Sequence, residues 1–156
     1  MAPPPADGVR VSHVAIAVTD LEASTRFYAE GLGFEPGASW SSGDEVAAVS
    51  EVKPPVKMSS RYLTKDAFRL ELMYWETPAV HGVASRYRNQ RGLTHLSFEV
   101  DDAAGTEARL LELGGIALPE ARVYIDRPHA GFSIVFLTDP DGTRIELLQR
   151  HAKTPG

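Results

Sequence analysis

The sequence contains no cysteine. This absence excludes disulfide bonds, metal sites built from thiolates and a cysteine nucleophile. Any metal ion that the chain binds must therefore be held by nitrogen and oxygen atoms. A chain without cysteine also fits the reducing cytosol, and we expect a cytoplasmic protein on that ground.

Long apolar runs and an excess of basic residues are absent as well. No apolar stretch approaches the roughly 20 residues that cross a bilayer, and the N-terminal segment MAPPPADG lacks the cationic and apolar parts of a secretion signal. The 16 Lys and Arg are outnumbered by 21 Asp and Glu, which gives a net charge of −5. Nucleic-acid-binding domains are usually basic. We therefore expect a small-molecule substrate, and neither a membrane nor a nucleic-acid partner.

The chain has 156 residues, of which 43% are hydrophobic, and we expect residues 1–156 to form a single domain around one core. Within it, a repeat is visible. Residues 11–35, VSHVAIAVTDLEASTRFYAEGLGFE, resemble residues 93–120, LTHLSFEVDDAAGTEARLLELGGIALPE, with His13 aligned to His95. Such self-similarity indicates that one structural unit occurs twice.

The repeat extends to the end of each half. Residues 62–75, YLTKDAFRLELMYW, resemble residues 136–149, FLTDPDGTRIELLQ, with Glu71 aligned to Glu146. Each half therefore begins with a segment that carries a histidine and ends with one that carries a glutamate.

Hydrophobic periodicity and turn signals predict the same order of elements in both halves. Each half has a strand with its histidine, a helix capped by an aspartate (Asp20 or Asp102), and three further strands. The three strands are expected at about 45–51, 58–64 and 68–75 in the first half, and at about 117–125, 132–138 and 143–149 in the second. This pattern predicts an α+β fold of two βαβββ modules, at about 10–76 and 92–149, with a connector at 77–91 that includes a short helix.

Alternation along the strands places the four repeated side chains opposite the core, because successive residues of a strand face opposite sides of the sheet. Apolar residues occupy the core side of each strand: Val14, Ile16, Val18, Leu70, Leu72, Leu96, Phe98, Val100, Ile145 and Leu147. A sheet with one face in water would give the same alternation. However, two histidines and two glutamates at duplicated positions, beside the small Ala15, Ala17 and Ser97, favour a cavity with a metal site.

Two neutral imidazoles and two carboxylates offer a divalent ion two nitrogen and two oxygen ligands, with no net charge after binding. Coordination positions stay open for water or substrate oxygens if the ion takes five or six ligands. Zinc, nickel, cobalt, manganese and iron all accept such ligands, so the sequence does not select the metal.

The repeated pattern, opened by HVAIAVTDLEASTRFYAEGLGF and closed by FLTDPDGTRIELL, resembles the vicinal oxygen chelate superfamily, which includes glyoxalases, bleomycin-resistance proteins and extradiol dioxygenases. The resemblance extends from Val11 to Gln149. It implies that the modules form a curled mixed sheet around a metal-binding cleft, and that the protein is a homodimer. The four ligand positions of the family fall on His13, Glu71, His95 and Glu146.

This ligand set is similar to those of glyoxalase I and methylmalonyl-CoA epimerases. Extradiol dioxygenases normally lack a carboxylate at the place of Glu71. The resemblance therefore implies a metal-dependent isomerase or lyase that removes a proton next to a carbonyl of a substrate chelated through its oxygens. Glu146 is the first candidate for the base and Glu71 the second, while the further glutamate of epimerases could only be Glu45 or Glu51. A catechol dioxygenase and a metal-free antibiotic-binding protein remain as alternatives.

The connector carries three arginines, Arg86, Arg88 and Arg91. They could bind an anionic substrate such as a phosphate or carboxylate. A connector that is simply solvated explains them equally well.

Overall fold

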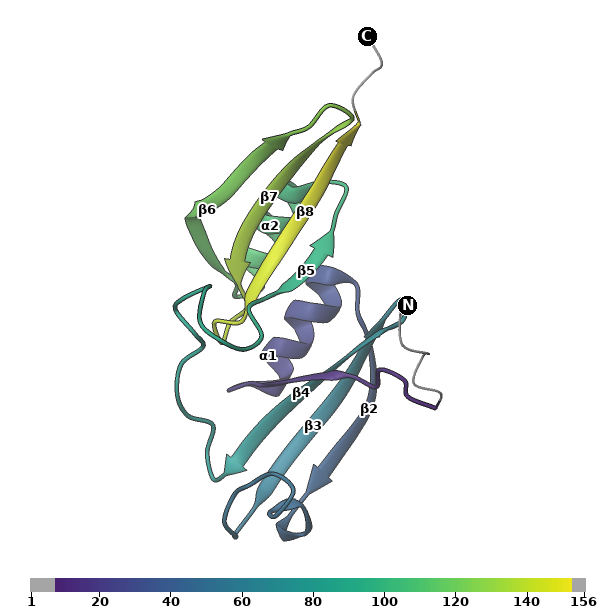
Figure 1. The fold of residues 1–156 in the computed structure, drawn as a ribbon. Helices are drawn as coiled ribbons and strands as arrows, with labels where there is room; N and C mark the ends of the chain where they lie inside the picture. Colours follow the sequence, from purple (N-terminus) through teal and green to yellow (C-terminus); the bar gives the residue numbers. More distant parts are fainter. Residues whose placement is uncertain (1–7, 153–156) are drawn as a thin grey trace, which may run out of the picture.

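The first half of the chain folds into one βαβββ module, as predicted. The computed structural model describes residues 8–152 (Figure 1). Asp20 caps the helix by accepting a hydrogen bond from the backbone N–H of Ala23. The elements are β1 (Val14–Ala17), α1 (Leu21–Arg26), the π-helical turn η1 (Phe27–Gly31), β2 (Glu35–Ser42), the 3-10 turn η2 (Asp44–Val46), β3 (Lys57–Lys65) and β4 (Phe68–Thr77). They form a sheet of order β1-β4-β3-β2, in which β1 and β4 are parallel and the other pairs antiparallel.

The second half repeats this arrangement, which confirms the α+β fold of two βαβββ modules. Asp102 caps the second helix through the N–H of Gly105. The elements are β5 (Leu96–Glu99), α2 (Ala103–Glu112), β6 (Ile116–Asp126), β7 (Ala130–Thr138) and β8 (Arg144–Ala152), in a sheet of order β5-β8-β7-β6. The two sheets are not hydrogen-bonded to each other within residues 8–152, so β1 and β5 are edge strands. One chain therefore holds two separate four-stranded sheets rather than one curled sheet.

Two local predictions were wrong. The strand expected at 45–51 lies at Glu35–Ser42 instead, and the connector contains no helix. The true strand, EPGASWSS, contains proline and glycine and is exposed along most of its length, so it has no apolar alternation to reveal it. The segment 44–56 is apolar for another reason, because Ala47 and Val56 are buried against Met58.

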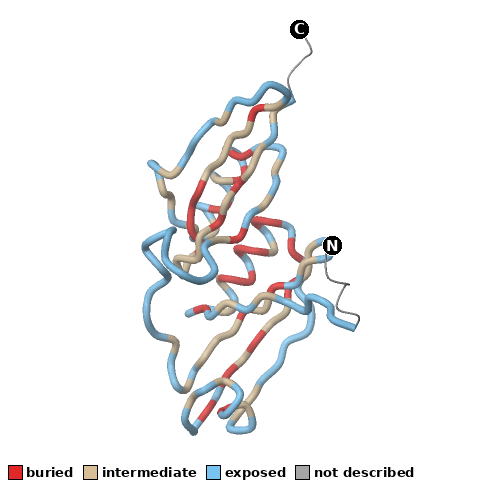
Figure 2. Tube along the Cα trace, viewed as in Figure 1, coloured by how far each residue is buried: buried red, intermediate tan, exposed pale blue. Residues whose placement is uncertain are grey.

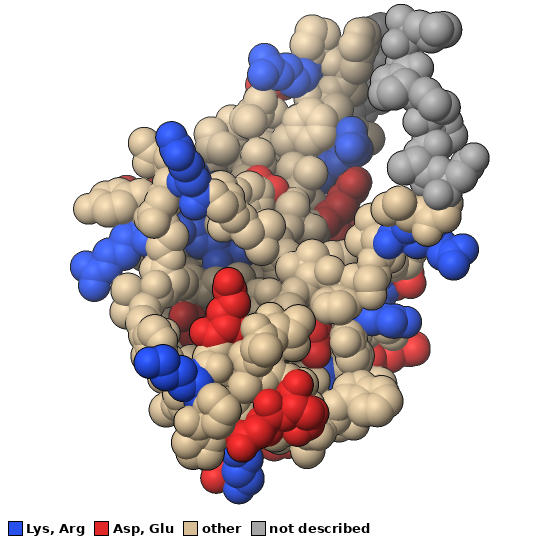
Figure 3. Space-filling view, turned by 60° about the horizontal axis from the view of Figure 1, so that its bottom comes forward, with Lys and Arg blue, Asp and Glu red and all other residues tan. Residues whose placement is uncertain are grey.

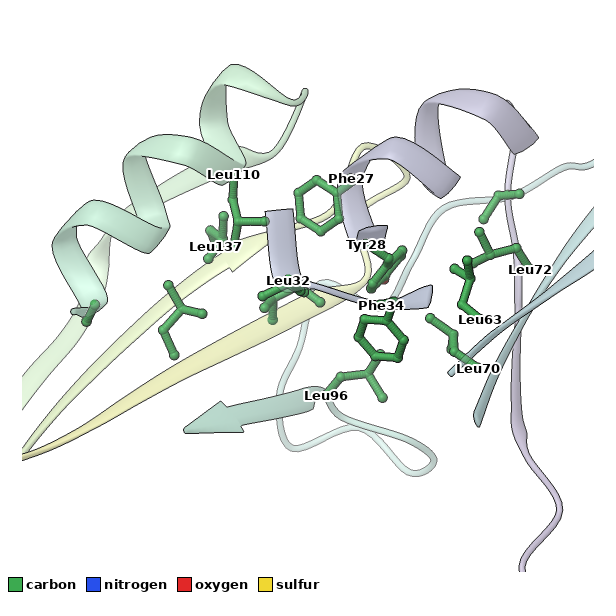
Figure 4. Close-up of a cluster of buried hydrophobic side chains, with 14 residues drawn as sticks. Phe27, Tyr28, Leu32, Phe34, Leu63, Leu70, Leu72, Leu96, Leu110 and Leu137 are labelled. Atoms are coloured by element: carbon green, nitrogen blue, oxygen red, sulfur yellow. The ribbon is translucent and has the colours of Figure 1, made fainter. Parts of the chain in front are cut away.

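The larger hydrophobic core joins the two modules (Figure 4). Phe27, Tyr28 and Leu32 of the first helical segment lie between the inner faces of both sheets. The core side chains from the strands and from α2 are Leu63, Leu70, Leu72, Leu96, Leu110, Leu137, Ile145 and Leu147. Figure 2 shows this buried stripe along α1 and the inner strands. The predicted core side of each strand is thus confirmed, and the repeated histidines and glutamates lie on the opposite faces.

A buried polar contact also links the modules. The hydroxyl of Tyr28 donates to Oδ2 of Asp139 over 2.8 Å, and both residues are fully buried. Oδ1 of Asp139 accepts from the backbone N–H groups of Asp141 and Thr143, which closes the turn between β7 and β8. Burial raises the pKa of the Asp139 carboxyl, although these hydrogen bonds oppose the shift.

Candidate functional site

His13 and Glu71 come together at the edge of the first sheet. His13 directly precedes β1, and Glu71 lies on β4 opposite Ala15. Nε2 of His13 is 3.2 Å from Oε2 of Glu71, and their side chains are 31% and 12% exposed. We call this pair the first half-site.

His95 and Glu146 form the equivalent pair in the second module. His95 directly precedes β5, and Glu146 lies on β8 opposite Ser97. The Nε2 to Oε2 distance is 3.5 Å, with side-chain exposures of 28% and 17%. This pair is the second half-site, and its register shows that the sequence repeat is preserved in three dimensions.

The other ring nitrogen of each histidine is held by a neighbouring hydroxyl. Nδ1 of His13 lies 2.8 Å from Oγ of Ser12, and Nδ1 of His95 lies 2.7 Å from Oγ1 of Thr94. A hydroxyl that accepts from Nδ1–H leaves the Nε2 lone pair free, which is the arrangement of most metal-binding histidines. Sequence reasoning missed these two residues, although a hydroxyl residue before each histidine was a visible signal.

The donor geometry fits a metal ion. Two ligands bonded to one ion at about 2.1 Å are about 3.0–3.4 Å apart, and the two observed distances of 3.2 and 3.5 Å lie within about 0.1 Å of this range. Each half-site supplies one nitrogen and one oxygen, which is half of the expected ligand set. The same distance suits a direct hydrogen bond when Nε2 carries the proton.

An aromatic ring supports the imidazole in each half-site. Tyr62 contacts His13 edge-on with ring centres 5.3 Å apart, and Phe136 contacts His95 in the same way at 5.2 Å. These rings occupy equivalent places, because Tyr62 lies opposite Glu71 and Phe136 opposite Glu146. Desolvation raises the pKa of the Tyr62 hydroxyl, and the charge of Glu71 adds to the shift. Neither ring was among the residues predicted from the sequence.

The two half-sites do not meet within one chain. Among residues 8–152, no three His, Asp or Glu side chains are placed to hold one metal ion. The four predicted ligands are therefore brought together as two pairs rather than as one set of four. A complete site requires a second chain or a rearrangement of the modules.

A groove follows the free edge of β5. It has a volume of 1240 Å³ and is lined on one side by His95, Ser97 and Glu99. It is also lined by residues 30–34 and by the β3–β4 turn at residues 65–68. The groove therefore leaves the β5 backbone accessible beside the second half-site.

Charges of both signs are interspersed on the surface. Figure 3 shows a hollow near the middle of one face, with acidic and basic side chains both around it. No field of a single sign covers this face. No helix in the described part of the chain is long and apolar enough to cross a membrane.

Glu45 and Glu51, the candidates for a further base, do not lie on a strand, because the strand predicted at 45–51 is absent from that segment. Glu45 lies in η2, where its carboxylate accepts from the N–H of Gly43 over 2.8 Å. This hydrogen bond lowers the pKa of Glu45. Glu51 lies in a turn with a positive φ of 56°.

Comparison with known proteins gives relatives over nearly the whole chain. Residues 10–147 match the model of the Glyoxalase/Bleomycin resistance protein/Dioxygenase superfamily. An ethylmalonyl-CoA/methylmalonyl-CoA epimerase of Cereibacter sphaeroides is 30% identical, covering 90% of this chain and 97% of its own. A lactoylglutathione lyase of Salmonella typhimurium is 32% identical, covering 90% and 93%. A glyoxalase family protein from Bacillus cereus shares the fold, with a TM-score of 0.77, 18% identity and coverage of 97% and 100%.

Proposed function

This chain belongs to the Glyoxalase/Bleomycin resistance protein/Dioxygenase superfamily, and from that premise we propose that it is a metal-dependent isomerase or lyase. It would move a proton on the carbon next to a carbonyl group of a small substrate. The observation that carries the proposal is the duplicated His–Glu pair, with each Nε2 facing a carboxylate and each Nδ1 held by a hydroxyl. Such pairs suit a divalent ion such as zinc, nickel, cobalt, manganese or iron.

We propose further that two copies of the chain complete each site. The backbone groups along the outer edges of β1 and β5 have no partner strand in the described chain, and free strand edges pair readily with another chain. In a two-fold dimer, β1 of each copy would pair with β5 of the other. The first half-site of one copy would then face the second half-site of its partner, and the groove along β5 would be filled.

The residues of such a site would have different roles. A bound ion would polarise the substrate carbonyl and stabilise the negative charge that develops when the proton leaves. Glu146 is our first choice for the group that accepts and returns the proton. Glu71 lies beside the Tyr62 hydroxyl, which restrains it, whereas the equivalent Phe136 has no hydroxyl to hold Glu146. The less restrained carboxylate is the better proton carrier, and Glu71 is the second candidate.

The names of the relatives suggest the substrate class. Methylmalonyl-CoA and lactoylglutathione are both thioesters with a substituted carbon beside the carbonyl. We therefore propose a thioester, or a compound that becomes one in the reaction, as the substrate.

Metal analysis and solvent exchange test the reaction. We expect the purified protein to hold one divalent ion per chain, and the His13→Ala and Glu146→Ala variants to lose it. Deuterium from the solvent should enter the carbon beside the carbonyl of a methylmalonyl or lactoyl thioester. A metal-free protein would favour an antibiotic-binding role instead, and oxygen uptake with catechols but no exchange would favour a dioxygenase.

A mixing experiment tests the shared site. One variant carries His13→Ala and Glu71→Ala, and the other carries His95→Ala and Glu146→Ala. Each alone should be inactive, but a mixed dimer contains one intact site and one with no ligands. Random exchange of subunits should thus restore about a quarter of the wild-type activity and metal content. If subunit exchange is verified and no activity or metal content recovers, a site shared between chains is excluded.

A further inference from the structure

The connector arginine Arg88 lies against the second half-site. Its guanidinium carbon is 3.5 Å from the ring centre of Phe136. The same ring supports the imidazole of His95 and lies opposite Glu146. Arg88, which lies outside the repeated segments, is thus brought beside two of the predicted ligands.

Arg144 holds the connector in this position. Its guanidinium donates hydrogen bonds to the backbone carbonyls of Ser85 and Arg86. Within the connector, the hydroxyl of Ser85 donates to Gln90 and accepts from the N–H of Tyr87, which closes the segment into a tight turn. Specific contacts of the residues before and after Arg88 therefore fix its position.

The first half-site has a corresponding cation. Arg69 precedes Glu71 by two residues, and its guanidinium carbon lies 5.6 Å from the ring centre of Tyr62. Arg144 occupies the equivalent position before Glu146, but it is engaged with the connector. Each half-site thus has one guanidinium over the ring that supports its histidine, and in the second module the connector supplies it.

Arg88 has no acidic partner within residues 8–152. Other arginines of the chain do form ion pairs, as Arg26 does with Glu30 and Arg122 does with Glu107. The flat face of the Arg88 guanidinium is taken up by the ring, but its N–H donors lie at the edge of the group and remain available. This edge is the part of arginine that binds carboxylate and phosphate groups in pairs of hydrogen bonds.

We propose that Arg88 binds an anionic group of the substrate, a carboxylate or a phosphate, next to the metal ligands. The inference rests on the proposed function and adds to it: the substrate carries a negative charge close to its reacting carbon. Arg88 is a specificity residue in this scheme, and Arg144 is a positioning residue that acts through the connector.

Anion binding to the purified protein tests this proposal. Malonate and inorganic phosphate are titrated calorimetrically into the wild type and into Arg88→Gln, with the metal content of every sample measured. We expect Arg88→Gln to lower the binding affinity for one of the two anions by about tenfold to a hundredfold, as for the loss of hydrogen bonds to a charged group. A loss confined to malonate identifies a carboxylate ligand, and one confined to phosphate identifies a phosphate.

Arg91→Gln is the matched control, because it removes the same charge from the same connector at a residue whose side chain makes no hydrogen bond or ion pair within residues 8–152. Its anion affinities should stay within about twofold of the wild type, and Arg88→Lys should recover only part of the lost affinity. Equal affinity of Arg88→Gln and wild type for both anions overturns the inference. The absence of measurable binding of either anion to the wild type also overturns it. If Arg88-dependent binding is found in a protein without metal or solvent exchange, the proposed reaction fails while the anion site stands.

Discussion

At the scale of single residues, the hydroxyls of Ser12 and Thr94 fix the ring orientation of the histidines that follow them. Such partners of metal-binding histidines typically change metal affinity when they are removed. We expect Ser12→Ala and Thr94→Val each to weaken metal binding about tenfold to a hundredfold. Competition with a chromophoric chelator measures this change.

Ser41→Ala on the exposed strand β2 is a suitable control, since Ser41 lies away from both half-sites in the sheet order. It should bind metal as the wild type does. Unchanged affinity in both Ser12→Ala and Thr94→Val would argue that the His–Glu pairs are only hydrogen-bonded surface pairs.

The buried Asp139 should give the stability a distinct pH dependence. Its pKa is raised in the folded state, mainly by burial, so the folded protein binds this proton more tightly than the unfolded chain does. The contribution of the protonated carboxyl is fully present below the unfolded pKa of about 3.9, and it is lost as the pH rises through the raised folded pKa. Asp139→Asn removes this titration.

We therefore expect the free energy of unfolding of Asp139→Asn, relative to wild type, to increase between pH 4 and the folded pKa and then to level off. Urea titrations at a series of pH values measure the difference. Tyr28→Phe serves as the comparison, because it leaves Oδ2 of Asp139 without its donor and should cost about 1–3 kcal/mol. A difference between Asp139→Asn and wild type that is independent of pH would contradict this account.

The repeat made the ligand candidates visible in the sequence because aligned positions in the two halves carry the same chemistry. His13 with His95 and Glu71 with Glu146 stand out for that reason. Tyr62 and Phe136 are the aligned first residues of the segments 62–75 and 136–149 and are both aromatic, so the repeat carried a signal for them as well. Arg88 has no counterpart at an aligned position, so the repeat could not distinguish it from Arg86 and Arg91. A comparison of the two halves of the sequence cannot reveal a contact that only one module forms.

At the scale of elements, the connector depends on Arg144 for its attachment to the second module. Loss of the two hydrogen bonds to the backbone of residues 85–86 should let this segment open more often, and local opening exposes a chain to proteases. We expect Arg144→Gln to be cleaved by trypsin at Arg86, Arg88 or Arg91 several times faster than the wild type. Mass spectrometry of timed digests identifies the sites.

Arg127→Gln, in the turn between β6 and β7, is the control for a change of charge on an exposed segment. Its connector should be cut at the wild-type rate. Equal cleavage of the Arg144→Gln connector would show that other contacts, such as the packing of Gly142 near Ala84, hold the segment in place.

Most strands could be located from sequence because one of their faces is buried in the shared core. β3, β4, β7 and β8 carry strong alternation and lie within a few residues of their predicted positions. β2 has neither a buried face nor regular alternation, and the neighbouring apolar segment at 44–56 misled the assignment. Apolar content alone does not distinguish a strand from a loop that covers the end of a sheet.

At the scale of the whole molecule, a shared site would couple metal binding to self-association. A ligand that binds only the dimer stabilises it by mass action. We expect removal of the metal with EDTA to shift the protein from dimer toward monomer on dilution. Sedimentation velocity at several protein concentrations, with and without the chelator, measures the shift.

A His13→Ala, His95→Ala double variant provides the reference, because its association should be weaker than that of the loaded wild type and insensitive to the chelator. If loaded and metal-free wild type associate equally at all concentrations, the metal does not lie between the copies. The sequence could reveal the two modules and their candidate ligands, but not their assembly, because a free strand edge does not specify in the sequence which strand will pair with it.

The difference between Tyr62 and Phe136 has a consequence for substrate orientation. In a completed centre, two equivalent sides would meet, one ending in a hydroxyl and the other in a plain benzene ring. A centre with exact two-fold symmetry would bind a substrate equally well in two orientations related by that rotation. The hydroxyl of Tyr62 makes these two orientations unequal, so one of them would be preferred.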